Sequence, residues 1–281
     1  MSVKSTIIFA FAGMIFLFSC VFGQQQAKRT YTKADFINID GSSLNEKIER
    51  AFKQFKGSGQ GETLWIAYHF PARDGMAYGP FTGMVYYDNG IKLERRDDPA
   101  QAAVFLLTDA TGSNPKFKSV RTLNLSEPYV FEDRPIYWLG DIDAAQSLTL
   151  LEAEIRTENE SKELAKGSLR AIAVHDNPRV ITLLKDIAKK DTNDEIQRAA
   201  VSNLARLKTP QSLDVLIELY DSSSIDSIKE EIIGGIARDE SRKATDKLLA
   251  IAKNDPNPKL RQRAIRRLSS NRGSGMGIWI N

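Results

Sequence analysis

The chain has 281 residues, of which 42% are hydrophobic and 27% are charged, and its formal net charge at pH 7 is +3. This is the composition of a globular protein with one large or two small domains, so a chain unable to bury a core is excluded. The only cysteine is Cys20, which excludes a disulfide framework and leaves no set of cysteines for a zinc site.

Residues 1–23 predict a secretory signal peptide. A positive charge at Lys4 precedes an almost wholly apolar run, 7–18, and small residues follow before Gln24. The run is shorter than the ~20 residues that a membrane-spanning helix needs. We therefore expect an exported protein, periplasmic or secreted, whose mature chain begins at Gln24.

A second way of processing the same segment stays open. The sequence Leu17-Phe18-Ser19-Cys20 resembles a bacterial lipobox, in which the cysteine becomes the lipidated N-terminus, although Phe18 departs from the usual small or β-branched residue. Lipidation of Cys20 would make the protein an envelope-anchored lipoprotein. We expect membrane association only in that case.

Residues 32–141 predict an α+β domain. Ser43 precedes Glu46 at the spacing of a capping box, and the apolar residues that follow fall on one helix stripe. Short apolar runs with strand patterning then follow, one pair of them joined by Asn89-Gly90, a strong hairpin signal. The expected strands are 64–70, 84–87, 91–93, 103–107, 120–125 and 136–139. We expect one helix packed on an antiparallel sheet of about five strands.

Residues 142–272 predict a solenoid of stacked helix pairs. Apolar residues coincide at a spacing of 32 in six columns over three copies: Leu184, Leu216, Leu248; Ile187, Leu219, Ile251; Ile196, Ile228, Leu260; Ala200, Ile232, Ala264; Val201, Ile233, Ile265; and Leu204, Ile236, Leu268. A degenerate fourth copy lies upstream, with Ile155, Leu164, Leu169 and Ile172 in the same columns. A single helix pair cannot bury its apolar face, whereas stacked copies can.

The segments 194–204 and 257–268 resemble the second helices of HEAT-like repeats of the phycobilisome-lyase type, and the resemblance covers about residues 145–272. It implies a helical solenoid that presents a binding surface. No lyase activity is carried over, because nothing here resembles a chromophore site. The position at which the family usually has an arginine is occupied by Gln197, Lys229 and Arg261 in the three copies. The residue at this position is expected to bond an inter-repeat loop.

Gly234-Gly235, inside a second helix, departs from the family pattern. Because glycine costs a helix up to about 1 kcal/mol relative to alanine, we expect the third copy to be bent or loosely packed.

The C-terminal part of the solenoid is strongly basic. Residues 242–272 contain ten Lys or Arg and two Asp, a net charge of +8, so the rest of the chain sums to −5. The predicted binding residues are Lys259, Arg261, Arg263, Arg266 and Arg267. They favour an acidic protein or envelope surface as partner. No nucleic acid is expected, because no aromatic side chain lies among them for base stacking; the alternative is a solubilising end of the stack.

The sequence offers no evident catalytic set, metal site or cofactor. The two histidines, His69 and His175, have no cysteine partner for a zinc site or a nucleophilic pair. Asp141 and Asp143 have a metal-like spacing that helix capping explains better. The leading hypothesis is an exported, non-enzymatic interaction or scaffold protein.

The alternative function is a secreted hydrolase with its site around His69, Glu132 and Asp133 in the α+β domain. The tail, 273–281, holds four apolar residues among three glycines. An open solenoid end needs a cap, so the tail is expected to cover the last repeat, to add a strand to the sheet or to bind a partner.

Overall fold

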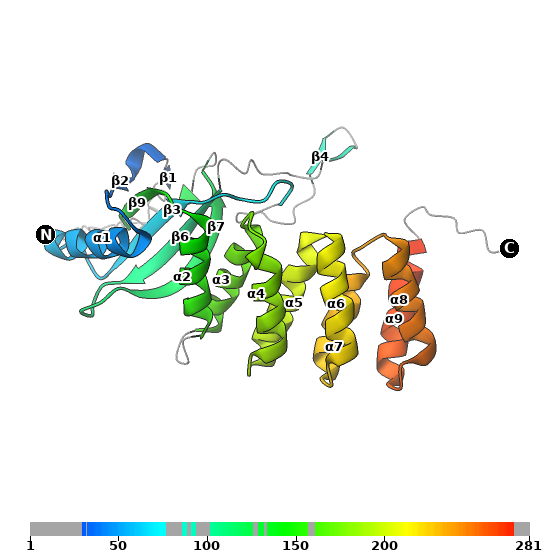
Figure 1. The fold of residues 1–281 in the computed structure, drawn as a ribbon. Coiled ribbons are helices and arrows are strands. Elements are labelled where there is room, and N and C mark those ends of the chain that lie inside the picture. Colours follow the sequence, from blue (N-terminus) through cyan, green and yellow to red (C-terminus); the bar gives the residue numbers. More distant parts are fainter. Residues whose placement is uncertain are drawn as a thin grey trace, which may run out of the picture.

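The computed structural model describes residues 30–31, 33–76, 86–88, 91–93, 102–125, 129–131, 134–156 and 161–272. A sheet with one helix lies at one end of the molecule, and helices α2 to α9 extend from it in a row (Figure 1). The predicted α+β half followed by a helical solenoid is therefore confirmed. The predicted signal peptide, Cys20 and the tail lie outside the described residues, and no helix within those residues has the length and apolarity to span a bilayer.

Five strands form the main sheet. Their order is β2 (Ile37–Asn38), β9 (Ile136–Asp141), β3 (Thr63–His69), β6 (Ala102–Asp109) and β7 (Lys116–Asn124). β3, β6 and β7 pair antiparallel, as expected, but β9 runs parallel to both β3 and β2. The sheet is thus mixed rather than antiparallel, because the chain crosses over from β7 to the far side of β3.

The predicted hairpin forms a separate small sheet. β4 (Tyr86–Asp88) pairs antiparallel with β5 (Ile91–Leu93), and the turn residues Asn89 and Gly90 lie outside the described residues. Another two-stranded sheet joins β1 (Thr30–Tyr31) to β8 (Tyr129–Val130), and a short 3-10 helix, η1, spans Lys33–Asp35. The main sheet reaches five strands through β2, which the sequence pattern did not predict.

Helix α1 (Leu44–Ser58) packs its apolar stripe on the sheet. The Ser43 hydroxyl accepts the Glu46 N–H at 3.3 Å, as the capping box predicts. The Glu46 carboxylate accepts the N–H of Ser42 at 2.8 Å instead of that of Ser43, so the reciprocal bond is displaced by one residue. Gly59 ends the helix with φ 64°, in the left-handed region that favours glycine.

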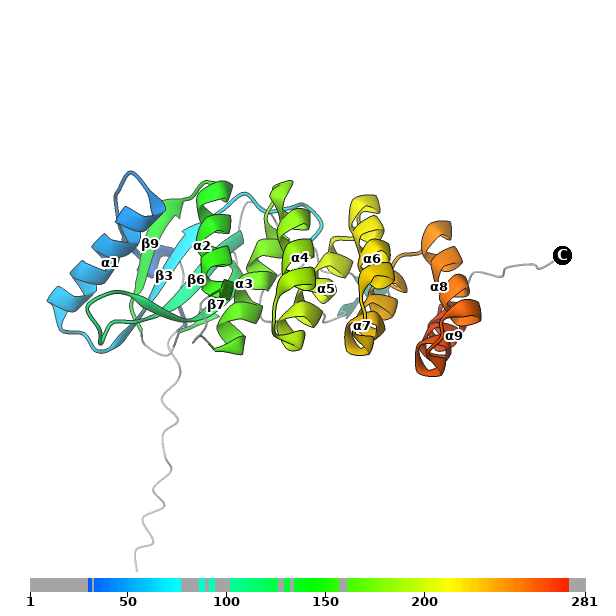
Figure 2. The same ribbon diagram turned by 60° about the horizontal axis from the view of Figure 1, so that its bottom comes forward.

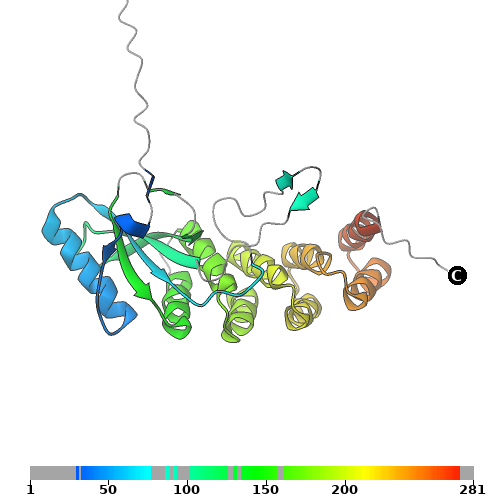
Figure 3. The ribbon, with the colours of Figure 1, turned by 90° about the horizontal axis from the view of Figure 1, so that it is seen from above.

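Four helix pairs make up the solenoid. They are α2 (Ala144–Arg156) with α3 (Lys162–Val174), α4 (Arg179–Lys190) with α5 (Asp194–Leu207), α6 (Pro210–Ser222) with α7 (Asp226–Ile236), and α8 (Arg242–Asn254) with α9 (Pro258–Arg272). Seen from above, the first and second helices of the pairs form two rows (Figure 3). Every residue of the six predicted columns is buried except Ile265 and Leu268, both in the last copy.

Gly235 allows α7 to approach its neighbours closely. It is buried, and a Cβ at this position would lie 2.9 Å from the Cβ of Ala205 in α5. The expectation of loose packing is therefore wrong at this point, because the missing side chain is what permits the tight helix contact. Next to it, the guanidinium groups of Arg263 and Arg267 lie over Gly234, within 3.8 Å of where its Cβ would be.

The sheet and the solenoid share one core. Figure 2 shows α2 and α3 directly beside the sheet, where α3 packs against β7. Gly167 of α3 faces the strand so closely that a Cβ there would overlap the Val120 carbonyl oxygen. After β3, the Arg73 N–H donates to the Val174 carbonyl at 2.7 Å. A single cluster of buried apolar residues therefore runs from the sheet to the last helix pair.

Candidate functional site

Two of the five predicted binding residues have partners inside the stack. Arg261 Nη1 donates to the carbonyls of Asp255 at 2.8 Å and Pro256 at 3.1 Å, which fixes the turn between α8 and α9. Arg263 Nε donates to the Glu230 carbonyl at 2.8 Å, which ties α9 to α7. Arg261 thus holds the last helix pair together and Arg263 joins it to the preceding pair, so both cations are less available to a partner.

Arg261 bonds the turn within its own helix pair and not the inter-repeat loop expected from the family resemblance. The corresponding Lys229 has its Nζ 5.1 Å from the centre of the Tyr220 ring, a cation–π contact. Gln197 is buried, and its Oε1 has no hydrogen-bond partner among the described residues. The residues at this position therefore differ between the three copies in the contacts that they make.

The other three predicted binding residues are not held by contacts within the stack. Lys259, Arg266 and Arg267 are exposed, and their side chains form no hydrogen bond or ion pair with another described residue. α9 carries six Lys or Arg and no Asp or Glu. The last helix therefore presents uncompensated positive charge at the end of the row.

The charges of the earlier copies are paired across successive helix pairs. Lys185 Nζ lies 2.7 Å from a Glu218 oxygen, and Lys162 Nζ lies 2.8 Å from a Glu195 oxygen. Lys247 is 2.5 Å from Asp221, and Lys243 also pairs with Asp214. Exposed ion pairs contribute at most about 1 kcal/mol each, so their main effect is on the charge distribution. On α9, Arg263 pairs with Glu230 of α7 in the same way, but Lys259, Arg266 and Arg267 have no such partner among the described residues.

A second group of cations lies on the same row of helices, and the sequence did not single it out. Arg170 is on α3, Arg206 on α5, and Arg238 follows α7. Arg206 is partly buried, and this burial, together with the nearby charges of Arg170 and Arg238, lowers its pKa. Since like charges destabilise one another, an anionic group placed near them would be stabilised. The 32-residue spacing of Arg206 and Arg238 could have indicated this group of cations. Acidic residues nearby in the sequence balance their charge, so these segments show no excess of positive charge.

His69 pairs with a carboxylate at the edge of the sheet. Its Nδ1 lies 3.0 Å from Oδ1 of Asp141, because β3 and β9 are parallel and end side by side. The other ring nitrogen, Nε2, is buried without a hydrogen-bond partner among the described residues. Glu132 and Asp133 lie outside those residues. Within the described part of the chain, the histidine has no hydroxyl or thiol partner that would serve as a nucleophile.

A buried hydrogen-bond chain joins the sheet to the solenoid. Tyr68 Oη lies 2.9 Å from Ser147 Oγ, which lies 2.8 Å from His175 Nε2, and His175 Nδ1 lies 2.8 Å from the Ala171 carbonyl. Since a carbonyl only accepts, Nδ1 carries the proton, Nε2 accepts from Ser147, and Ser147 accepts from Tyr68. The phenyl ring of Phe70 stacks on His175 with ring centres 4.0 Å apart.

This chain is structural rather than catalytic. A serine hydrogen-bonded to a histidine resembles a nucleophilic pair, but Ser147 and His175 are both fully buried. A substrate therefore cannot reach the hydroxyl. Burial also lowers the pKa of His175 to about 4, so the ring is neutral near pH 7. The hydrogen-bond chain instead links β3, α2 and the end of α3.

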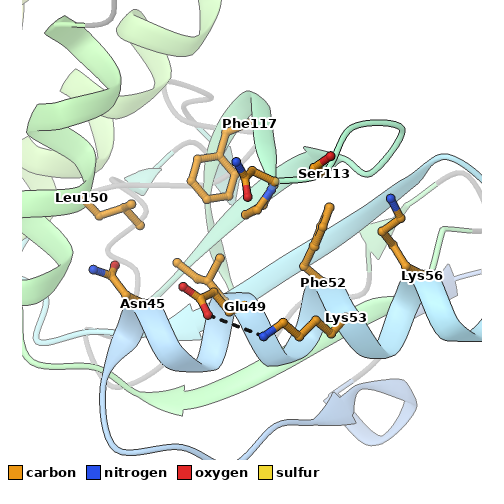
Figure 4. A pocket seen from close by; sticks show the side chains of 11 residues that line it. Asn45, Glu49, Phe52, Lys53, Lys56, Ser113, Phe117 and Leu150 are labelled. Atoms are coloured by element: carbon orange, nitrogen blue, oxygen red, sulfur yellow. Dashed lines mark ion pairs between the residues drawn. The ribbon is translucent and has the colours of Figure 1, made fainter.

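A groove runs between α1, the turn joining β6 to β7, and α2 (Figure 4). Its volume is about 680 Å³, within the size range of ligand sites. Phe52 and Phe117 line it together with other apolar groups, and Glu49, Lys53 and Lys56 are its only charged residues. Glu49 and Lys53 face each other at 3.9 Å. The lining thus combines apolar surface with one carboxylate and two ammonium groups, which suits a ligand with both apolar and charged parts.

Asp141 and Asp143, which lie between the sheet and the first solenoid helix, have structural partners. Asp143 Oδ1 accepts the N–H groups of Ala145 at 2.8 Å and Gln146 at 3.3 Å, which caps α2. Asp141 is the partner of His69. Among the described residues, no three His, Cys, Asp or Glu side chains come together as a metal site.

Comparison with known proteins identifies the repeats. Residues 148–237 match the family model described as HEAT repeats, which confirms the predicted resemblance. A search of curated proteins found no match to the chain.

Two solved structures are similar to parts of the chain. One is human deoxyhypusine hydroxylase in complex with glycerol, with 12% identity and a TM-score of 0.39, covering 45% of this chain and 44% of that one. The other is the complex of CpcE and CpcF of phycocyanin lyase from Nostoc sp. PCC7120, with 19% identity and a TM-score of 0.33, covering 44% of this chain and 88% of that one. The chain thus spans less than half the length of the hydroxylase.

Proposed function

We propose that this chain is an exported, non-enzymatic interaction or scaffold protein that receives an acidic partner on its second-helix row. HEAT-type solenoids commonly use extended helical surfaces for binding. The observation that carries the proposal is the charge distribution: acids of the earlier copies are paired across helix pairs, whereas Lys259, Arg266 and Arg267 on α9 are not. We call these three residues the α9 cations.

The arginines of the earlier copies extend this surface. Arg170, Arg206 and Arg238 lie on α3, on α5 and just after α7, in the same row of helices as α9. An acidic segment lying along the row would meet cations on successive copies. Such complementarity mainly raises the association rate and makes binding salt-dependent.

Affinity capture tests the proposal. The chain beginning at Gln24 is immobilised and exposed to the envelope fraction of its own cells at low and high salt. The test variant carries Arg266→Glu and Arg267→Glu; the control carries Lys189→Glu and Lys253→Glu, which change the net charge equally but lie on the first-helix row. The expected result is one dominant acidic partner that is lost at high salt and with the test variant, but is kept by the control.

Two other outcomes count against the proposal. A partner that both variants bind equally would move the site elsewhere, with the groove of Figure 4 as the next surface to mutate. The absence of any partner at either salt concentration would contradict the scaffold function.

Export is part of the proposal and is supported by the composition of residues 1–23. Mass spectrometry of the protein from its own cells should find a mature N-terminus at Gln24. A lipidated Cys20 would instead support the envelope-anchored alternative, and recovery in the membrane fraction should then disappear in Cys20→Ala.

A hydrolase remains the second candidate function, favoured by the pairing of His69 with Asp141 at the edge of the sheet. A broad hydrolase substrate screen of wild type and His69→Ala tests it. Activity lost in the variant with unchanged thermal unfolding would support a site there, whereas no turnover above background would oppose it.

A further inference from the structure

The last helix exposes an apolar strip that earlier copies bury. Val201 of α5 and Ile233 of α7 are fully buried, but Ile265, in the same column, is 51% exposed. The next column repeats the pattern, since Leu204 and Ile236 are buried and Leu268 is only partly buried. Successive second helices pack against each other, and α9 is the last of the row (Figure 1). The strip of Ile265 and Leu268 therefore lies where a following copy would pack.

A second copy of the chain is a poor occupant for this strip. Stacking two α9 helices face to face would bring together six Lys or Arg from each, with no acid on either. Like charges at such short range oppose association. An uncharged apolar segment would cover the strip without this repulsion.

The chain carries such a segment directly after α9. Residues 273–281 have no charged side chain, and Met276, Ile278, Trp279 and Ile280 supply apolar surface. Three glycines in residues 273–277 tolerate the backbone conformations of a chain reversal.

The tail is also long enough to reach back to Ile265. From Ile265 to the end of α9 the helix rises about 10 Å, at roughly 1.5 Å per residue. Residues 273–278 span up to about 20 Å when extended, so Ile278 can return to the level of Ile265. There, Trp279 would also lie near the guanidinium groups of α9, which aromatic rings attract.

We propose that residues 276–280 fold back onto α9 of the same molecule, cover Ile265 and Leu268, and so close the solenoid. This intramolecular cap takes the place of a further repeat. It requires no partner, so it can fail or hold independently of the proposed function.

The fluorescence of Trp279 tests the cap. The other two tryptophans, Trp65 and Trp138, are only 1% and 6% exposed, so the difference between wild type and Trp279→Phe isolates the signal of Trp279. In the wild-type chain this signal should lie at a shorter wavelength than that of free tryptophan amide. Its quenching by acrylamide should be several-fold weaker.

A matched pair of variants then locates the contact. Ile265→Asn should release the tail and raise Trp279 quenching to the level of the free amide. Ile225→Asn should leave it unchanged, because Ile225 has a similar exposure, 37%, but lies before α7. Circular dichroism verifies that both variants keep the helical content of wild type.

Three results would overturn the proposal. The first is Trp279 of wild type being quenched as readily as the free amide, a measurement that needs no folded Ile265 variant. The second is protection that survives Ile265→Asn, which would put the tail elsewhere. The third is protection that fades on dilution, which would make a second molecule the occupant.

Discussion

Acidification from about pH 7.5 to about pH 5 is expected to destabilise the fold through one buried residue, His175. Burial lowers its pKa to about 4, against an ordinary value near 6.5. Between these values the unfolded chain takes up a proton that the folded chain excludes. The associated stability is complete above about pH 6.5 and is lost as the pH falls towards 4. The full difference corresponds to about 3 kcal/mol, of which about 2 kcal/mol is lost at pH 5.

The hydrogen-bond chain explains why the protonated ring is excluded. Protonation of Nε2 would turn this nitrogen into a donor to Ser147, so that the O–H of either Ser147 or Tyr68 would need another acceptor. A buried donor without a partner costs about 1–3 kcal/mol.

Urea unfolding followed by circular dichroism at the two pH values measures the effect. The wild-type midpoint should fall by roughly 1 M, whereas His175→Gln, less stable at pH 7.5, should show little further loss at pH 5. The chain has only two histidines, so His69→Gln is the matched control and should keep the wild-type loss. Hydrogen bonds lower the pKa of the half-buried carboxyls Glu46 and Glu195 from 4.5 to about 2, so the stability that they contribute is lost only as the pH falls below about 4.5, under this window. An equal loss in wild type and His175→Gln would refute the reasoning.

Three further predictions concern stability and can be checked by thermal or urea unfolding. Gly167→Ala should cost about 2–3 kcal/mol, because its Cβ would overlap the backbone of β7, whereas Gly57→Ala, with open space around it, should be neutral or stabilising. Tyr220→Phe should cost about 1.5–3 kcal/mol, since it removes a 2.6 Å hydrogen bond to a buried carboxylate; an unchanged midpoint would contradict this. Arg261→Ala should lower stability by about 1–2 kcal/mol but spare partner binding, and Arg266→Ala should do the reverse.

The solenoid was predictable because stacking repeats the same contact in every copy. Helices that pack on one another need apolar side chains at equal spacing, and the 32-residue columns record that requirement directly. Local chemistry was equally visible, as in the Ser43 cap of α1 and the Asp143 cap of α2.

What depends on neighbours distant in sequence was not predictable. The parallel pairing of β9 follows from the chain crossing the sheet, which strand composition does not encode. The burial of His175 was not predicted, because its contacts come from α2, from α3 and from Phe70 after β3. Gly235 broke a helix rule locally while meeting a packing need that only the fold reveals. The cations at Arg206 and Arg238 had regular spacing but no net-charge signal.

The two ends of the solenoid differ, and this sets an order of local unfolding. At one end, α3 packs against β7 and shares its core with the sheet, while at the other end α9 packs, among the described elements, only against helices of its own and the preceding pair. In a chain of nearest-neighbour contacts, the element with fewest interfaces opens first. Hydrogen-exchange protection should therefore decline from α3 towards α9. A partner that binds the α9 cations would then also make local unfolding of the last helix pair less frequent. The tighter this partner binds, the more it stabilises that pair.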